Sequence, residues 1–234
     1  MRRRAGLTLI ELLLAVGLMA VVALVAFLTF HSALRAWRAG TELSNSLHQG
    51  DYVMEQIVMG LRSSYWRAAP GYGFQLYDDG SGSGARDAIA WTKFGSALIG
   101  AETPYAGMPH AVEVSLRDVD DGRGGTRSGL TVRSWRLDLQ KEEFDPDRDV
   151  PPVVLSTRIV GFNCRVLDPD QPPPTPGEPK PELKWTDEWK DASTNKLPYA
   201  VEVTLYAEPA QAGQEPVEIK RIVRVPMAER SWGR

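Results

Sequence analysis

The sequence predicts an α+β fold in which one long N-terminal helix precedes a domain built mostly of antiparallel β-sheet. Three observations lead to this fold class. An apolar stretch runs from Leu12 to Phe30, a helical spacing of apolar residues continues after it, and no proline occurs before Pro70. Beyond that proline, apolar and polar residues alternate, which is the pattern of strands with one buried face.

The first part of the expected helix, residues 7–31, has the length and composition of a membrane span. A hydrocarbon core of about 30 Å needs about 20 apolar residues at about 1.5 Å each. Arg2, Arg3 and Arg4 precede the span, and positive charges of this kind stay on the cytoplasmic side. A cleaved secretory signal is the alternative, but its apolar region is normally only about 7–15 residues long. We therefore expect a single-pass protein whose N-terminus is cytoplasmic.

From Ser32 the expected helix becomes amphipathic and continues to Arg67. Its apolar residues recur at intervals of three, four and seven, so they form one stripe, and most charged residues fall outside it. We expect residues 32–67 to pack on a globular head formed by residues 68–234. The stripe consists of Leu34, Leu43, Leu47, Met54, Ile57, Val58, Leu61 and Tyr65.

The head contains seven segments with strand signals. In one of them, 130–139, the apolar phase shifts between Val132 and Trp135, which predicts a β-bulge. A mostly antiparallel sheet packed on the second half of the long helix is the simplest arrangement. The segments are 89–94, 111–117, 130–139, 153–156, 160–166, 199–205 and 217–225.

Two other segments of the head are expected to be flexible loops. The loop near 78–87 is rich in glycine, serine and aspartate, and the loop near 168–182 contains seven prolines. Such a proline-rich segment is typically extended and exposed. A ligand for a partner domain is the alternative interpretation of the second loop.

The residue types that commonly carry catalysis or bind metals are scattered along the chain and form no recognisable cluster. His31, His48 and His110 lack the spacing of metal ligands, and Cys164 lies on the apolar face of an expected strand, as a small core residue does. The aspartate-rich turns at 118–121 and 145–149 imitate calcium loops only in part, because Val150 stands where such a loop has glycine. We expect neither an enzyme nor a cofactor or metal site, with both turns explained better by local structure.

Net charge argues against bulk binding of nucleic acid. The chain has 27 Lys and Arg and 30 Asp and Glu; residues 1–40 hold five of the former and one of the latter, so 22 and 29 remain beyond them. An acidic exterior repels phosphate backbones. No nucleic-acid partner is expected.

The segment Gly6-Leu7-Thr8-Leu9-Ile10-Glu11 resembles the class III leader of type IV pilins and type II secretion pseudopilins. This resemblance implies a pilin-like fold, a leader of residues 1–6, cleavage by a prepilin peptidase between Gly6 and Leu7, and N-methylation of Leu7. It also implies that Glu11 neutralises the amine of a neighbouring subunit in the filament. A charged side chain in a bilayer usually has a partner. The alternative is that Glu11, only about 6 Å into the mature helix, reaches the headgroups.

Residues 155–206 resemble the C-terminal half of the J-type minor pseudopilins, the general secretion pathway protein J family. The resemblance lies in Trp185 and Trp189, spaced W-x-x-x-W, and in the segment LPYAVEVTL at 197–205. It implies a minor pseudopilin of the inner membrane with a periplasmic head, incorporated at or near the tip of a type II secretion pseudopilus. The implied partners are other minor and major pseudopilins and the inner-membrane assembly platform. A minor pilin of a type IV pilus or DNA-uptake system is the nearest alternative, and a membrane-tethered or secreted enzyme is a more distant one.

Overall fold

The long N-terminal helix is present, and it ends at Arg62 rather than at Arg67. In the computed structural model, helix α1 comprises Leu9–Arg62. Immediately after it, Ser64 bridges to Lys93 of a neighbouring strand, and the main-chain amide of Tyr65 donates to the carbonyl oxygen of Thr92 at 2.9 Å. Tyr65, expected on the helix stripe, is therefore joined to a sheet instead, because strand pairing satisfies its backbone.

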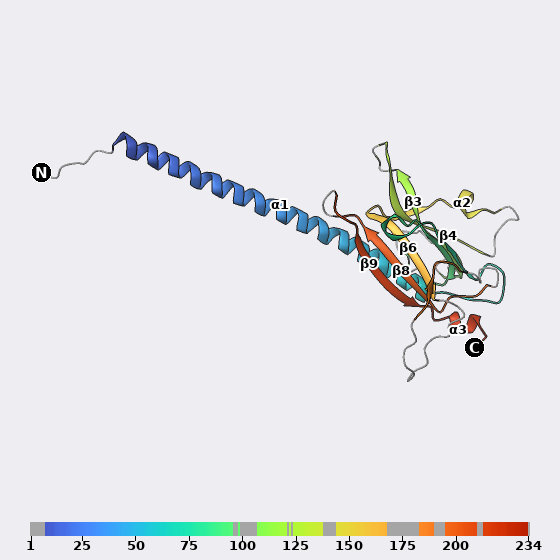
Figure 1. Ribbon diagram of the computed structural model, residues 1–234. Coiled ribbons are helices and arrows are strands. Elements are labelled where there is room, and N and C mark those ends of the chain that lie inside the picture. Colours follow the sequence, from blue (N-terminus) through green and yellow to red (C-terminus); the bar gives the residue numbers. More distant parts are fainter. Residues whose placement is uncertain are drawn as a thin grey trace. The chain divides into compact units, whose positions relative to one another are not determined.

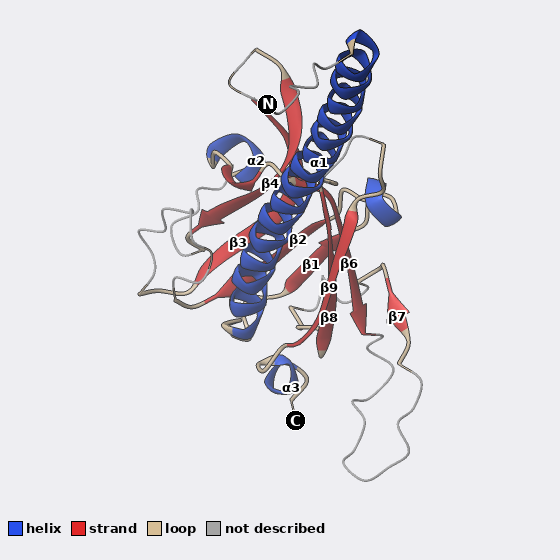
Figure 2. Cartoon of the chain, turned by 90° about the vertical axis from the view of Figure 1, so that its left-hand side faces the viewer, coloured by secondary structure: helices blue, strands red, loops and turns tan. Residues whose placement is uncertain are grey.

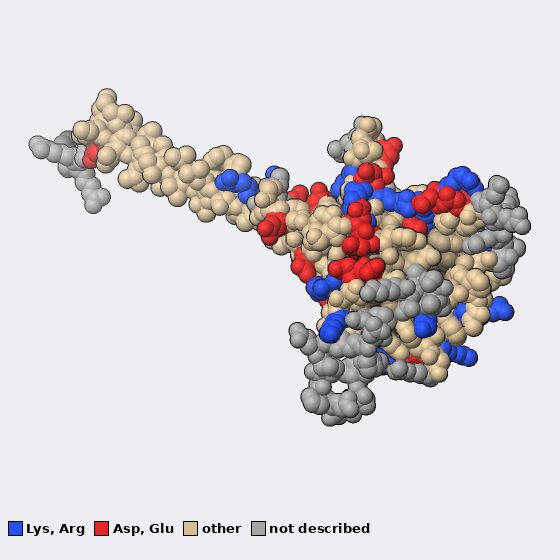
Figure 3. Space-filling model, turned by 45° about the vertical axis from the view of Figure 1, so that its right-hand side comes forward, with Lys and Arg blue, Asp and Glu red and all other residues tan. Residues whose placement is uncertain are grey.

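The structure describes residues 8–95, 98, 107–120, 122, 124–137, 144–167, 183–189, 195–209 and 213–233. The chain divides into an N-terminal unit, residues 1–45, and a β domain, residues 46–234. The described part of the N-terminal unit is helical from Leu9 onward, and nearly all of its side chains are exposed. Few of these side chains carry charge (Figure 3). The helix is long and apolar enough, by length and composition, to cross a membrane.

The β domain contains two antiparallel sheets among the residues described (Figure 1). The first is a meander in the order β1-β2-β3-β4-β5, and the second has the order β7-β6-β8-β9. All seven predicted strands are confirmed, and β1 and β7 are additional short strands. Their bounds are Phe74–Tyr77 (β1), Ala88–Lys93 (β2), His110–Asp120 (β3), Thr126–Trp135 (β4), Val153–Ser156 (β5), Ile159–Leu167 (β6), Trp185–Thr186 (β7), Ala200–Ala207 (β8) and Val217–Arg224 (β9).

Three short helical segments complete the described elements: η1 (Gly82–Gly84), α2 (Pro146–Asp149) and α3 (Ala228–Ser231).

The predicted bulge in 130–139 is wrong in position. Strands β3 and β4 pair without interruption from Asp120 opposite Thr126 to Ala111 opposite Trp135. The register shift instead lies between Leu130 and Thr131, where β4 pairs with β5. Trp135 broke the apolar phase because it lies on the outer face of β4, where the ring of Phe144 packs 6.4 Å away.

The second part of α1 packs on the inner faces of both sheets and supplies the centre of the core (Figure 2). Val53, Met54, Ile57, Val58 and Leu61 are each at most 5% exposed. They recur at helical spacing, and burying each such side chain stabilises the fold by about 1.5–3 kcal/mol. Within the β domain the predicted apolar stripe is confirmed up to the end of α1, at Leu47, Met54, Ile57, Val58 and Leu61, but not at Tyr65, which lies beyond the helix. Two earlier positions of the stripe, in the N-terminal unit, are exposed.

Part of the segment predicted as a loop near 78–87 is fixed against β6. The main-chain amide of Phe162 donates to the carbonyl of Ala85 at 2.9 Å, and the amide of Asp87 donates back to the carbonyl of Phe162 at 3.0 Å. The buried carboxylate of Asp87 also accepts from the amides of Asp79 at 3.0 Å and Cys164 at 2.7 Å. Composition gave no sign of these contacts. The other predicted loop, 168–182, lies outside the described residues.

Gly161 permits this close approach. A Cβ atom at Gly161 would lie 2.5 Å from the carbonyl oxygen of Ser83 and 3.0 Å from the ring of Tyr206. Only glycine therefore lets the backbone of η1 rest directly on β6.

Candidate assembly site

Helix α1 begins with two side chains that bind each other's backbone. The amide and the hydroxyl of Thr8 both donate to Glu11 Oε2 at 2.9 Å, and the amide of Glu11 lies 3.4 Å from Thr8 Oγ1. This reciprocal arrangement is a capping box, which satisfies amides that the first turn of a helix leaves without partners. Sequence reasoning had identified Glu11 by its charge and by the leader motif, and it had missed the role of Thr8, although the T-x-x-E spacing is a helix-start signal.

The capping box leaves part of the Glu11 carboxylate open. Both hydrogen bonds from Thr8 reach Oε2, and none from a described residue reaches Oε1. A carboxylate has about four acceptor positions. Glu11 can therefore cap its own helix and still accept a cation from outside the chain.

The residues expected at the cleavage site, Gly6 and Leu7, lie outside the described residues. Of the predicted site residues Gly6, Leu7 and Glu11, the structure therefore describes Glu11, the assembly residue, and adds Thr8 beside it.

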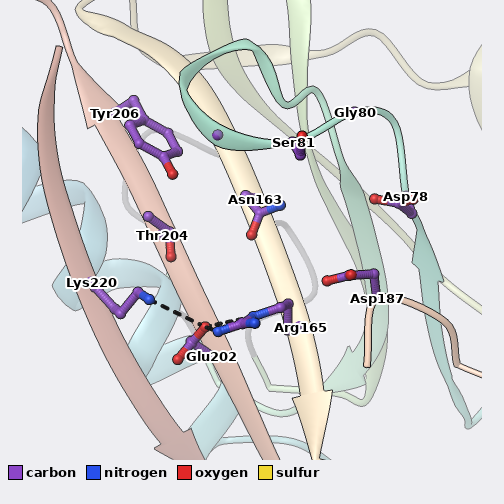
Figure 4. Close-up of a pocket in the computed structure, with 11 residues that line it drawn as sticks. Asp78, Gly80, Ser81, Asn163, Arg165, Asp187, Glu202, Thr204, Tyr206 and Lys220 are labelled. Atoms are coloured by element: carbon purple, nitrogen blue, oxygen red, sulfur yellow. Dashed lines mark hydrogen bonds and ion pairs between the residues drawn. The ribbon is translucent and has the colours of Figure 1, made fainter. Parts of the chain in front are cut away.

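A polar groove of about 470 Å³ lies on the outer face of the second sheet (Figure 4). At its floor, Glu202 of β8 is ion-paired with Arg165 of β6 and, at 3.4 Å, with Lys220 of β9. The Glu202 side chain is 7% exposed, so the two cations compensate a carboxylate that burial would otherwise make unfavourable. Asp78 and Asp187 lie at the opposite side of the groove. This mixture of signs does not point to one reaction.

A buried lysine and histidine form a second polar cluster, beneath the surface of the β domain. Lys93 is 1% exposed and His110 is 0% exposed. The ammonium of Lys93 donates to the carbonyl of Gly95 and lies 3.5 Å from His110 Nε2. Burial lowers the pKa of Lys93 to about 8. Both side chains are closed off from solvent, so this pair has no access to a substrate.

The two aspartate-rich turns make structural contacts. Asp120 accepts from the amide of Gly122 at 2.8 Å within the β3–β4 hairpin, and Asp145 caps α2 by accepting from the amide of Asp147 at 2.9 Å. The Asp147 carboxylate in turn binds Arg117 and Arg133, and these two guanidinium groups lower the pKa of Asp147. Within the described part of the chain, no three His, Cys, Asp or Glu side chains meet at a point that could hold a metal ion.

The tryptophans of the 155–206 segment cover the sheets. Trp189 is 5% exposed and meets Phe74 of β1 edge-on, with ring centroids 6.2 Å apart. Trp185 is half-buried in β7. Both positions fit a packing role.

Comparison with known proteins identifies the N-terminal segment. Residues 1–27 match the prokaryotic N-terminal methylation motif. This match, which is of the type IV prepilin kind, supports a pilin-like protein, and together with the apolar helix it supports anchoring in a membrane by the N-terminus. No curated protein matches the chain.

Proposed function

We propose that this chain is a structural minor pseudopilin at or near the tip of a type II secretion pseudopilus, where it helps to start the fibre that exports folded proteins. The observation that carries the proposal is the methylation motif at residues 1–27, joined to an apolar helix that continues into a β domain. The resemblance of residues 155–206 to J-type minor pseudopilins supports the choice of a secretion fibre.

In this proposal the chain acts by assembly and performs no catalysis. A prepilin peptidase cuts between Gly6 and Leu7, Leu7 is methylated, and the helix stands in the inner membrane with its head in the periplasm. The subunit then joins other minor and major pseudopilins on the inner-membrane assembly platform.

Glu11 guides incorporation through its charge. Cleavage creates a new α-amine on each subunit, and methylation leaves that amine positive. In an apolar surrounding, an unpaired charge is far more costly than a paired one. Glu11 keeps an open carboxylate oxygen while Thr8 binds the other. The amine of a neighbouring subunit can therefore reach Glu11 without breaking the start of α1.

The test compares Glu11→Ala with Thr8→Val in the native host, in a strain without the wild-type gene. Glu11→Ala removes the charge, and Thr8→Val removes only the cap hydroxyl, at a cost of about 1 kcal/mol to the helix start. Both chains should be cleaved and methylated at Leu7, which intact mass and N-terminal fragment spectra of the membrane-extracted protein would establish.

Incorporation is then measured as the amount of chain in sheared and purified fibres. Loss of an ion pair from an apolar site costs several kcal/mol, so Glu11→Ala should reduce incorporation at least about tenfold. Thr8→Val should remain near wild type. Equal incorporation of Glu11→Ala and wild type would refute the role of Glu11. A wild-type N-terminus at Met1 or near residue 27 would refute the pseudopilin assignment.

A further inference from the structure

Two arginines and a tryptophan follow the apolar stretch of α1. Arg35 and Arg38 are the only Lys, Arg, Asp or Glu residues between Glu11 and Glu42. Trp37 lies between them with 77% of its surface exposed. Neither arginine forms an ion pair with any residue that the structure describes. Among the residues that the structure describes, none forms a hydrogen bond, an ion pair or a ring contact with these three side chains.

Their distance along the helix matches the headgroup layer of a bilayer. From Leu9 to Phe30 the helix rises about 32 Å, which is close to the hydrocarbon thickness of about 30 Å. The Cα atoms of Arg35, Trp37 and Arg38 follow Phe30 by about 8, 10 and 12 Å at the same rise. Side chains of a helix point back toward its N-terminus. The guanidinium groups and the indole therefore lie closer to Phe30 than their Cα atoms do, at the level of a headgroup layer about 5–8 Å thick.

Their directions around the helix favour lipid over protein. At about 100° per residue, Trp37 lies about 200° and Arg38 about 300° from Arg35. An angle of about 300° equals about 60° in the opposite direction, so Arg35 and Arg38 share one face of α1, whereas Trp37 points to the opposite side. A protein partner covers one face of a helix, whereas a headgroup layer surrounds it.

The chemistry of the three side chains agrees with this surrounding. Guanidinium groups bind phosphate oxygens through paired hydrogen bonds. Tryptophan concentrates at the membrane interface, because its ring is apolar and its N–H is polar.

We propose that Arg35, Trp37 and Arg38 form a headgroup collar that binds phospholipids of the leaflet opposite the cytoplasmic N-terminus. The arginines bind lipid phosphates and enrich anionic lipids around the helix, and Trp37 lies at the level of the glycerol groups. The collar sets the depth of the unassembled subunit. It rests on the proposed function, since it requires residues 7–31 to span the bilayer.

The depth of Trp37 can be measured in vesicles that contain the full processed chain. The vesicles hold phospholipids brominated either near the glycerol or near the methyl end of the acyl chain, and bromine quenches tryptophan fluorescence at short range. Subtracting the signal of Trp37→Phe removes the contribution of the other tryptophans. Trp37 should be quenched at least about twofold more by the shallow bromines than by the deep ones.

A second arm tests the arginines. Brominated phosphatidylglycerol is diluted in phosphatidylcholine, and brominated phosphatidylcholine is diluted equally in the same mixture. Stronger quenching of Trp37 by the anionic lipid measures its local enrichment, for which each arginine can contribute up to about fivefold. The double variant Arg35→Gln, Arg38→Gln should abolish the enrichment, whereas the control Arg62→Gln, in the last turn of α1, should preserve it. Inorganic phosphate added to the solution should not reproduce the quenching of Trp37 by the anionic lipid, because a free anion carries no bromine and lacks the membrane anchor.

Failure of the collar and failure of the proposed function give different results. Met19→Trp, made in the Trp37→Phe background, reports on the middle of the span. If Met19→Trp is quenched by deep bromines while Trp37 is unquenched, or while Trp37 reports no enrichment of anionic lipid, the collar is refuted and the span stands. If neither position is quenched, residues 7–31 do not cross the bilayer, and the proposed function falls with the collar.

Discussion

Replacing Lys93 by methionine should change how the stability of the β domain depends on pH. Lys93 is 1% exposed, and burial lowers its pKa from 10.5 to about 8. Its ammonium faces the carbonyl of Gly95 and Nε2 of His110. His110 Nδ1 lies 2.9 Å from the carbonyl of Met108, and a carbonyl only accepts, so Nδ1 carries the proton and Nε2 offers its lone pair to Lys93.

The direction in which the free energy of unfolding changes with pH follows from proton binding by Lys93. Between pH 8 and pH 10.5 the unfolded chain keeps a proton on Lys93 that the folded chain has lost, so stability rises with pH across this window. One pH unit is worth about 1.4 kcal/mol per proton. The wild type should therefore gain about 3 kcal/mol in free energy of unfolding between pH 7 and pH 10.5, relative to a chain without this group.

Lys93→Met has nearly the same length and no charge, so the contribution should vanish. The assay is denaturant unfolding of both full chains in detergent at a series of pH values, with the variant's profile subtracted from the wild type's. Other titrating groups cancel in this difference, provided that the denaturant slope stays the same. Parallel profiles would refute the reasoning, because they would mean that water reaches the Lys93 ammonium in the folded protein.

Two further predictions concern the segment that rests on β6. Gly161→Ala should lower the free energy of unfolding by about 1–3 kcal/mol, because the new Cβ would lie 2.5 Å from the carbonyl oxygen of Ser83. The control Gly84→Ala, whose Cβ meets nothing within 4 Å, should change the free energy of unfolding much less. Equal losses for the two variants in urea unfolding would contradict this packing. Asp87→Ala should cost about 2–4 kcal/mol in the same assay, because two main-chain amides lose their acceptor inside the protein, and a change below about 0.5 kcal/mol would mean that water replaces the carboxylate.

The strands and the helix were predictable because their signals are periodic and local. The apolar residues from Met54 to Leu61 repeat at the helical period, and along every long strand apolar residues recur at alternate positions, so that they share one face. Trp135 shows where such reasoning fails. Its place on the outer face of β4 follows from the uninterrupted register with β3, and the ring of Phe144, just beyond the end of β4, packs against it there. The sequence pattern alone was taken for a bulge.

The sequence by itself determined the methylation motif, the apolar span and the charge of Glu11, because each depends on neighbouring residues and on the period of one helix. Tertiary structure decided where α1 ends, since Tyr65 leaves the helix to pair with β2. It also decided that Lys93 is buried and that η1 rests on β6 at Gly161. These features depend on which backbone and side-chain groups meet across long sequence separations, and only the packing of the helix and both sheets brings those groups together.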